Sequence, residues 1–102
     1  MKLTPGSRWK SAVCDAEVVA VRTPAGDVVL ACGGVPMIPV KDARPDMPQL
    51  QSAQENAALL GKRYADEASG LELLCNKSGK GALTLDDRAL TLKEAKKLPS
   101  SD

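Results

Sequence analysis

The chain has 102 residues, with 14 Lys and Arg against 13 Asp and Glu, and a formal net charge of +1. This near-balance creates no global field toward nucleic acid or an anionic membrane, so we expect neither as a partner. His and Phe are absent, and there is one Trp and one Tyr. The lack of His excludes Ser-His and Cys-His nucleophile pairs, imidazole bases and His-ligated zinc.

Targeting signals are not evident in the sequence. The first residues, Met1 to Gly6, contain no apolar run of signal-peptide length, and no segment approaches the ~18 apolar residues of a membrane helix. The three cysteines, Cys14, Cys32 and Cys75, are too few and odd in number for a secreted disulfide scaffold. We therefore expect a cytoplasmic protein.

Residues 1–38 predict a small β unit with short strands. Its elements in chain order are a strand opened by Trp9, a turn at 15–16, an apolar strand at 18–21, a Gly-containing hairpin turn at 23–27, a third strand at 28–31 and a sharp turn at Gly33-Gly34. Glycine accepts the positive φ that such a sharp turn requires.

Residues 39–60 are predicted to be a Pro-rich linker that contains a short helix. Pro39, Pro45 and Pro48 indicate irregular structure in its first part. Ser52-Ala53-Gln54-Glu55 has the form of a capping box, and Gly61 is suited to close a helix at its C-terminal end. These signals predict a helix near residues 53–60.

Residues 61–102 are predicted to repeat the first unit. Gly6-Ser7-Arg8-Trp9 matches Gly61-Lys62-Arg63-Tyr64 at an offset of 55, which falls to 53 beyond the hairpin turn, where Gly26 meets Gly79. The second copy has its sharp turn at Asp86-Asp87. We expect Trp9 and Tyr64 to occupy equivalent places in a shared core. Thr91 to Glu94 also has capping-box form and predicts a last helical turn before Pro99.

The first copy resembles desulforedoxin and the N-terminal domain of desulfoferrodoxin. The resemblance covers roughly residues 4–38 and is carried by Gly6, Trp9, Ser11, Cys14, Ala31, Cys32, Gly33 and Met37. It implies a rubredoxin-like or zinc-ribbon-like β unit in which four cysteines bind one iron and two units pair as a homodimer. The fold expected is therefore mainly β, with two small antiparallel units packed together and short helices in the linker and at the C-terminus.

The metal site implied by the resemblance is degenerate. Ser11 and Ala31 replace two of the four ligand cysteines, three rather than two residues precede Met37, and the second copy has Asp66, Ser69, Thr84 and Leu85 at the ligand positions. A tetrahedral thiolate site needs four donors, and a neutral hydroxyl is a poor substitute for a thiolate. One chain is therefore not expected to rebuild the iron centre or to transfer electrons as rubredoxin does.

Two functions follow from these observations. The first is a non-catalytic cytoplasmic binding or accessory protein that has lost an ancestral iron site and has no cofactor. We expect this protein to form a homodimer, and any further protein partner is not identified by the sequence. The alternative is a metal-binding or thiol redox module in which Cys14 and Cys32 act together, with zinc or iron held across a dimer. A small-molecule enzyme is disfavoured, since no nucleophile and base are paired in the sequence.

Three remaining signals have structural interpretations. Cys75 falls at the position of Ala20 within a strand and is expected to be a core residue. The acidic pairs Asp66-Glu67 and Asp86-Asp87 lie at predicted turns, where we expect them to be solvated. We also expect Cys14 and Cys32 to lie close together, because the family's two ligand turns converge on one ion.

Overall fold

The structure is a computed structural model that describes residues 1–93. Its regular elements are all β-strands, which confirms the prediction of a mainly β protein. In chain order they are β1 (Arg8–Lys10), β2 (Glu17–Arg22), β3 (Leu30–Cys32), β4 (Val35–Pro36), β5 (Ile38–Pro39), β6 (Arg63–Asp66), β7 (Leu71–Lys77), β8 (Leu83–Leu85), β9 (Arg88–Ala89) and β10 (Thr91–Lys93). In residues 1–93 there is accordingly no helix of the length and apolarity needed to cross a membrane.

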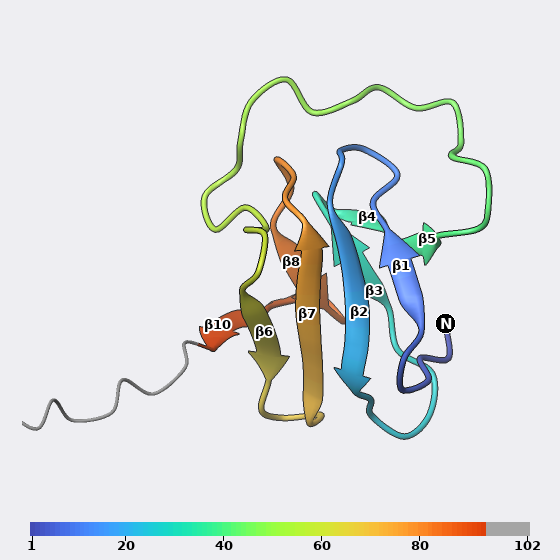
Figure 1. Cartoon of the computed structure of the whole chain (residues 1–102), viewed down its shortest axis with the longest axis vertical. Helices are drawn as coiled ribbons and strands as arrows, with labels where there is room; N and C mark the ends of the chain where they lie inside the picture. Colours follow the sequence, from blue (N-terminus) through green and yellow to red (C-terminus); the bar gives the residue numbers. More distant parts are fainter. Residues whose placement is uncertain (94–102) are drawn as a thin grey trace, which may run out of the picture.

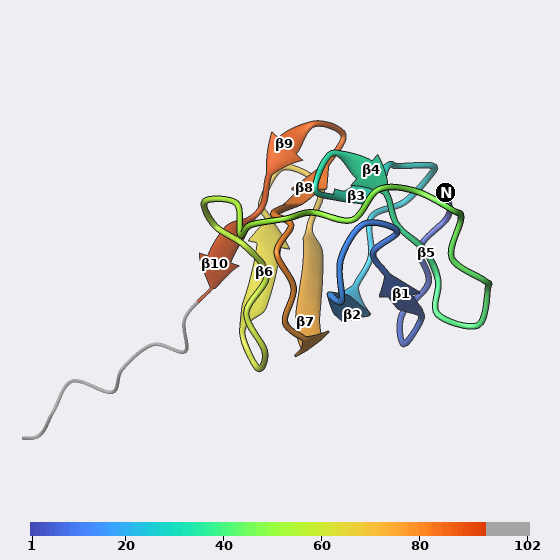
Figure 2. The ribbon, with the colours of Figure 1, turned by 90° about the horizontal axis from the view of Figure 1, so that it is seen from above.

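The strands form two antiparallel sheets. The six-stranded sheet has the order β10-β6-β7-β2-β1-β5, with β7 and β2 at its centre (Figure 1). The four-stranded sheet has the order β4-β3-β8-β9 and lies against one face of the larger sheet, as the view from above shows (Figure 2). In both sheets the central pair joins one strand from residues 1–38 to one strand from residues 61–93.

The strand pairings of the two halves have the same register. The corresponding pairs are Trp9–Val18 and Tyr64–Leu73, which are 55 residues apart, and Ala31–Pro36 and Thr84–Ala89, which are 53 residues apart. The edge strands follow the same rule, since β5 pairs with β1 as β10 pairs with β6. Each strand of the first half therefore has a counterpart in the second half, and the order of these counterparts is the same from either edge of each sheet.

The central pairings are also symmetric about their midpoints. In β2–β7, Val18 faces Cys75 and Ala20 faces Leu73, and each pair becomes the other under the offset of 55. In β3–β8, Ala31 faces Thr84 at the midpoint. The parts at 1–38 and 61–93 thus contribute strands to both sheets and share one core.

The core lies between the two sheets and is aliphatic, as the composition predicts. Its most enclosed side chains come from both halves and include Val18, Leu30, Leu71, Leu73 and Leu85. Burying apolar surface between two sheets is the main stabilising contribution available to a chain with so few aromatics. Both halves supply strands to each of its two walls.

The two aromatic residues differ in burial. Tyr64 is in the core, where its hydroxyl accepts a hydrogen bond from Leu59 N (2.9 Å) and donates one to Ala57 O (3.4 Å). Trp9 is only partly buried and packs at the edge of the core. The expectation that both would lie in the core is thus confirmed for Tyr64 and wrong for Trp9.

The sharp turns have the backbone conformation that their residues predict. Gly33 and Gly34 have φ of 66° and 82°, and Asp86 and Asp87 have φ of 48° and 66°. A two-residue hairpin with positive φ at both positions matches the right-handed twist of the flanking strands. Asp tolerates this region better than most residues with a side chain.

The helix predicted near residues 53–60 is absent, and this prediction is wrong. Ala58 is fully buried, its N–H donates to Gly81 O (3.0 Å), and its carbonyl accepts from Gly79 N (3.1 Å). Asn56 has a φ of 62°, which a right-handed helix excludes. The segment is held by hydrogen bonds to the β7–β8 hairpin, which satisfy the backbone groups that a helix would have paired internally.

The start of the predicted C-terminal helical turn is also wrong. Thr91–Lys93 is the edge strand β10, and the Thr91 hydroxyl donates to Ala65 O (3.0 Å) instead of capping a helix. The remainder of that predicted turn, at 94–98, lies outside the described residues. Pairing with β6 gives the backbone of β10 tertiary partners, and such partners outweigh a weak local helix signal.

Candidate functional site

The structure brings Cys14 and Cys32 together between the two sheets. Cys14 lies in the loop between β1 and β2, Cys32 ends β3, and their Sγ atoms are 3.7 Å apart. Cys14 is 5% exposed and Cys32 is fully buried, and both are free thiols. The prediction that these two side chains lie close together is confirmed.

Ser11 organises the loop that carries Cys14. Its side chain is fully buried, and Oγ accepts hydrogen bonds from Val13 N (3.1 Å) and Cys14 N (3.2 Å). Hydrogen bonding by the same hydroxyl also acts to lower the pKa of both the Cys14 and the Cys32 thiol. Ser11, at one of the positions where the resemblance implies a ligand, therefore holds the loop and acts on the pKa of both thiols.

Two glycines of the β7–β8 hairpin cover the thiol pair. A Cβ atom at Gly79 would lie 2.7 Å from Cys14 Sγ, and one at Gly81 would lie 2.7 Å from Cys32 Sγ. Such distances are far shorter than any van der Waals contact between carbon and sulfur, so these positions accept only glycine without rearrangement. Sequence reasoning assigned these glycines to a hairpin turn alone; their spacing of two was the only local signal of a second role.

The surroundings push the two thiol pKa values apart. Burial raises the pKa of Cys32 to about 12, and a negative charge on Cys14 adds to that rise. Burial also opposes ionisation of Cys14. There, hydrogen bonds from the Ser11 hydroxyl and from the N–H groups of Ala16 and Gly81 outweigh burial, so the pKa of Cys14 lies below its ordinary value. The favoured ionised state is a Cys14 thiolate that accepts a hydrogen bond from the Cys32 thiol.

Cys14 also borders a surface cavity. The cavity has a volume of about 240 Å³ and is lined by Val13, Cys14, Asp15, Gln49, Leu50, Gly79 and Lys80. Gln49 is fixed there by a hydrogen bond from Nε2 to Ala12 O (3.0 Å), and Lys80 Nζ donates to Gln51 O (3.2 Å). Cys32 is not part of the lining. Only one of the two paired sulfurs therefore belongs to a residue that meets solvent-accessible space.

The thiol pair is suited to two kinds of chemistry. Disulfide formation would shorten the separation of the sulfurs from 3.7 Å to about 2.05 Å. Two thiolates on one tetrahedral metal at ~2.3 Å would be about 3.8 Å apart, so the spacing also suits two ligands of such a site. Residues 1–93 bring no group of three or more His, Cys, Asp or Glu into metal-binding proximity. A metal here would need donors beyond the two thiols and the Ser11 hydroxyl.

The corresponding positions of the second half form an ion-pair cluster. Asp66 Oδ2 accepts hydrogen bonds from Ser69 Oγ (2.7 Å) and from Arg88 Nη2 (2.6 Å). These hydrogen bonds hold the pKa of Asp66 below its ordinary value. Of the other two positions, Leu85 is fully buried and Thr84 pairs across the sheet with Ala31.

The two acidic pairs differ from the expectation that both would be solvated. Glu67 is exposed, but Asp66 is 8% exposed and paired, so the expectation is wrong for Asp66. Asp86 and Asp87 are exposed, as expected, and Asp86 Oδ1 accepts a hydrogen bond from Val29 N (2.8 Å). Cys75 is buried in β7, as expected for a core residue, and its thiol donates to Lys77 O (3.1 Å).

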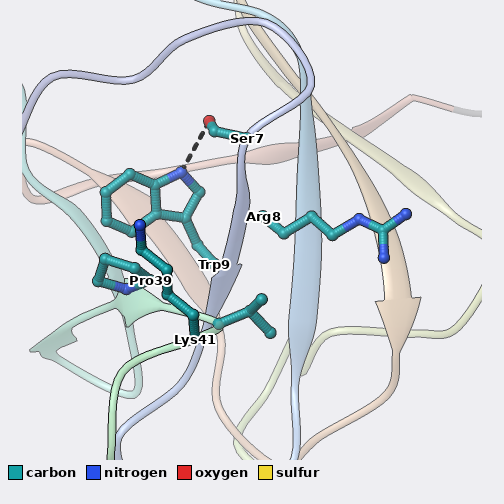
Figure 3. Close-up of a pocket in the computed structure, with 6 residues that line it drawn as sticks. Ser7, Arg8, Trp9, Pro39 and Lys41 are labelled. Atoms are coloured by element: carbon teal, nitrogen blue, oxygen red, sulfur yellow. Dashed lines mark hydrogen bonds between the residues drawn. The ribbon is translucent and has the colours of Figure 1, made fainter.

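A second cavity lies beside Trp9. It has a volume of about 330 Å³ and is lined by Ser7, Arg8, Trp9, Pro39, Val40 and Lys41. The Trp9 indole N–H donates to Ser7 Oγ (3.0 Å), and this bond fixes the ring between β1 and the end of β5 (Figure 3). No thiol or carboxylate lines this cavity, so it supplies no group for the chemistry above.

Comparisons with protein-family models, with curated proteins and with solved structures found no match to this chain.

Proposed function

We propose that this chain is a small thiol redox module in which Cys14 and Cys32 alternate between two thiols and an intramolecular disulfide. The observation that carries the proposal is the 3.7 Å contact between the two sulfurs inside the protein. This is the alternative that the sequence analysis left open. The non-catalytic accessory protein remains the competing proposal.

The ionisation of the pair supports this function. Thiol–disulfide exchange needs a thiolate as the attacking group. The lowered pKa of Cys14 and the raised pKa of Cys32 assign those roles in advance, with Cys14 as the attacking thiolate and Cys32 as the protonated partner. In a reducing compartment the resting state is the dithiol.

The scaffold belongs to the proposal as well. We infer that the two halves descend from one desulforedoxin-like unit that was duplicated and fused, after which the four-cysteine site was lost. Support comes from the matching registers at offsets of 55 and 53 and from the symmetric β2–β7 and β3–β8 pairings. In this view the cysteine pair is what remains of one metal site.

The function is tested by equilibrating the protein with mixtures of reduced and oxidised dithiothreitol and measuring its intact mass. We expect the wild type to lose the mass of two hydrogen atoms cooperatively, and peptide mapping to place the disulfide between Cys14 and Cys32. Cys75→Ala is the matched control and should behave as the wild type does, whereas Cys14→Ser and Cys32→Ser should form no intramolecular disulfide. A wild type that stays fully reduced under oxidising mixtures would favour the accessory protein.

The metal alternative is tested by elemental analysis of the purified protein. A zinc or iron site shared across a dimer would give about half an equivalent of metal per chain, because the two chains together would supply the four donors of one tetrahedral site. The result expected from the redox proposal is no stoichiometric metal. Homodimerisation also remains a proposal, and sedimentation velocity at micromolar concentration tests it; pairing of the halves within one chain favours a monomer.

The ancestry is tested by rebuilding the lost site. Ser11→Cys with Ala31→Cys would place cysteines at all four ligand positions of the first half. We expect this variant to bind one Co²⁺ per chain with the visible absorption of tetrahedral thiolate coordination. The matched control, Asp66→Cys with Ser69→Cys, leaves Thr84 and Leu85 in place and should bind none. Failure of the first variant to bind, while folded, would refute the equivalence of these positions with the family's ligands.

A further inference from the structure

We propose that the oxidant for this thiol pair is a small hydroperoxide that enters the cavity lined by Cys14. Cys14 attacks the hydroperoxide and is oxidised, and Cys32 then reacts with the oxidised Cys14 to form the disulfide. This inference rests on the proposed redox function and names its substrate class. It is carried by the position of the cavity, by its size and by the different access of the two cysteines.

Access assigns the first step to Cys14. Cys14 lines the cavity together with Gly79, and Gly79 lies directly against the Cys14 sulfur, where any side chain would collide with it. The absence of a side chain at Gly79 therefore leaves Cys14 its place beside the hairpin, where Cys14 still contributes to the cavity wall. Cys32 is fully buried, and Gly81 covers its sulfur. An oxidant from solvent meets Cys14 first.

The narrow access to Cys14 favours a small oxidant. A volume of about 240 Å³ equals that of about eight water molecules, at ~30 Å³ each. Hydrogen peroxide or a short alkyl hydroperoxide fits into that space. Cys14 is only 5% exposed, so oxidised glutathione, which contains two tripeptides, and a disulfide within a folded protein have less access to its sulfur than a peroxide has.

The groups around the Cys14 sulfur support attack on a peroxide oxygen. Hydrogen bonding by the N–H groups of Ala16 and Gly81 and by the Ser11 hydroxyl lowers the pKa of this thiol, so these groups stabilise a negative charge on the sulfur. These donors come from rigid backbone and from a buried side chain, so they need no reorganisation when the thiolate reacts. The cavity is also lined by the polar side chains of Lys80 and Gln49, which are able to form hydrogen bonds with a peroxide.

The reaction balances in two steps. The Cys14 thiolate attacks the terminal peroxide oxygen, the O–O bond breaks, and the alkoxide or hydroxide that leaves takes up a proton, so that Cys14 becomes a sulfenic acid and the hydroperoxide becomes an alcohol or water. The Cys32 sulfur then attacks the Cys14 sulfur, the S–O bond breaks, and the hydroxyl leaves as water with the Cys32 proton. An external dithiol reduces the resulting disulfide back to the starting state.

The test compares oxidants on the reduced full-length protein, with disulfide formation followed by rapid alkylation and intact mass. We expect hydrogen peroxide to oxidise the pair faster than it oxidises the same chain unfolded in urea, because the lowered pKa of Cys14 gives the folded chain more of the reactive thiolate at the same pH. Oxidised glutathione at equal concentration should be slower than hydrogen peroxide. Cys75→Ala should match the wild type.

The intermediate supplies a second readout. Oxidation of Cys32→Ser should stop at the sulfenic acid on Cys14, which dimedone traps. The wild type oxidised in the presence of dimedone should carry any label on Cys14 alone, and this second experiment keeps the test valid if the variant does not fold. Faster oxidation by glutathione disulfide, or dimedone on Cys32, would overturn this inference while leaving the redox function intact. Formation of no disulfide with either oxidant would instead refute the redox function itself.

Discussion

Two equivalent places in this molecule have been filled in opposite ways. In the first half, Ser11 and Cys14 meet Cys32 in a buried thiol pair, and in the second half the corresponding Asp66 and Ser69 meet Arg88 in an ion pair at the surface. The strand registers around the two places are the same. The scaffold therefore tolerates a pair of thiols or a carboxylate and guanidinium at this position, provided that the polar groups are paired.

The covering hairpins account for the difference. Gly79 and Gly81 of the second half lie directly on the two sulfurs, whereas their counterparts in the first half are Gly26, which has open space around it, and Val28, which is buried. The first place is thereby covered on its hairpin side, while Arg88 at the second place remains about half exposed (48%). Close packing suits neutral thiols, and partial exposure suits a charged pair, whose desolvation would otherwise oppose folding.

The largest expected effect is loss of stability at alkaline pH. The pKa of Cys32 is raised from 9.0 to about 12, so the unfolded chain loses its proton at a lower pH than the folded chain does. The stabilisation from this group is complete below pH 9 and is lost as the pH rises toward 12, by several kcal/mol at about 1.36 kcal/mol per pKa unit. The lowered pKa of Cys14 acts in the opposite sense below pH 9, where the folded chain loses that proton first. Burial also raises the pKa of Cys75 and Tyr64, with the same sign.

Urea unfolding of the reduced protein at a series of pH values between 8 and 11 checks this. Cys32→Ala is the control, because it removes the group with the largest shift, and its stability should fall less steeply over the same range. If stability fell equally steeply with pH in the two proteins, the pKa of Cys32 would be the same in the folded and the unfolded chain.

The next effect concerns the hairpin that covers the thiols. Gly81→Ala would place a Cβ 2.7 Å from Cys32 Sγ and 2.8 Å from Gly33 N, and we expect it to cost about 3 kcal/mol, since overpacked cores relax only partly. Gly26→Ala, at a position with open space but a φ of 84°, should cost only about 1 kcal/mol. Equal losses would mean that the hairpin does not press on the thiol pair. Urea unfolding at pH 7 measures both variants.

A smaller loss is expected from Ser11→Ala. Two buried N–H groups, those of Val13 and Cys14, would lose their acceptor, at a cost of about 2 kcal/mol. The Cys14 thiolate would also lose a donor, so its alkylation by iodoacetamide at pH 7 should slow. A destabilised variant that alkylates at the wild-type rate would restrict Ser11 to a structural role.

The smallest effect is expected in the ion pair of the second half. Asp66→Asn should cost about 1 kcal/mol at pH 7, because Arg88 is exposed enough for water to screen its charge. The Asp66 pKa is lowered below 3.8, so its contribution is present above that pH and is lost as the pH falls through the lower folded value. Unfolding of the two proteins should therefore differ at pH 7 and converge as the pH falls through the lowered pKa of Asp66.

Local chemistry determined much of the strand and turn structure. The β2 and β7 strands and the positive φ of Gly33-Gly34 and Asp86-Asp87 follow from apolar runs and from the residues that accept a left-handed backbone. The proximity of Cys14 and Cys32 came from the family resemblance, since no local pattern relates two residues 18 positions apart.

Only the tertiary structure decided the features that depend on which strands pair. The segment at 53–60 has a helix signal yet is held in an irregular conformation by hydrogen bonds to the β7–β8 hairpin, and Asp66 is paired with an arginine 22 residues away. The glycines over the sulfurs belong to the opposite half of the chain. Side-chain and hairpin contacts across two sheets satisfy backbone and charged groups at long range, and these contacts outweigh the weak preferences that a short window of sequence expresses.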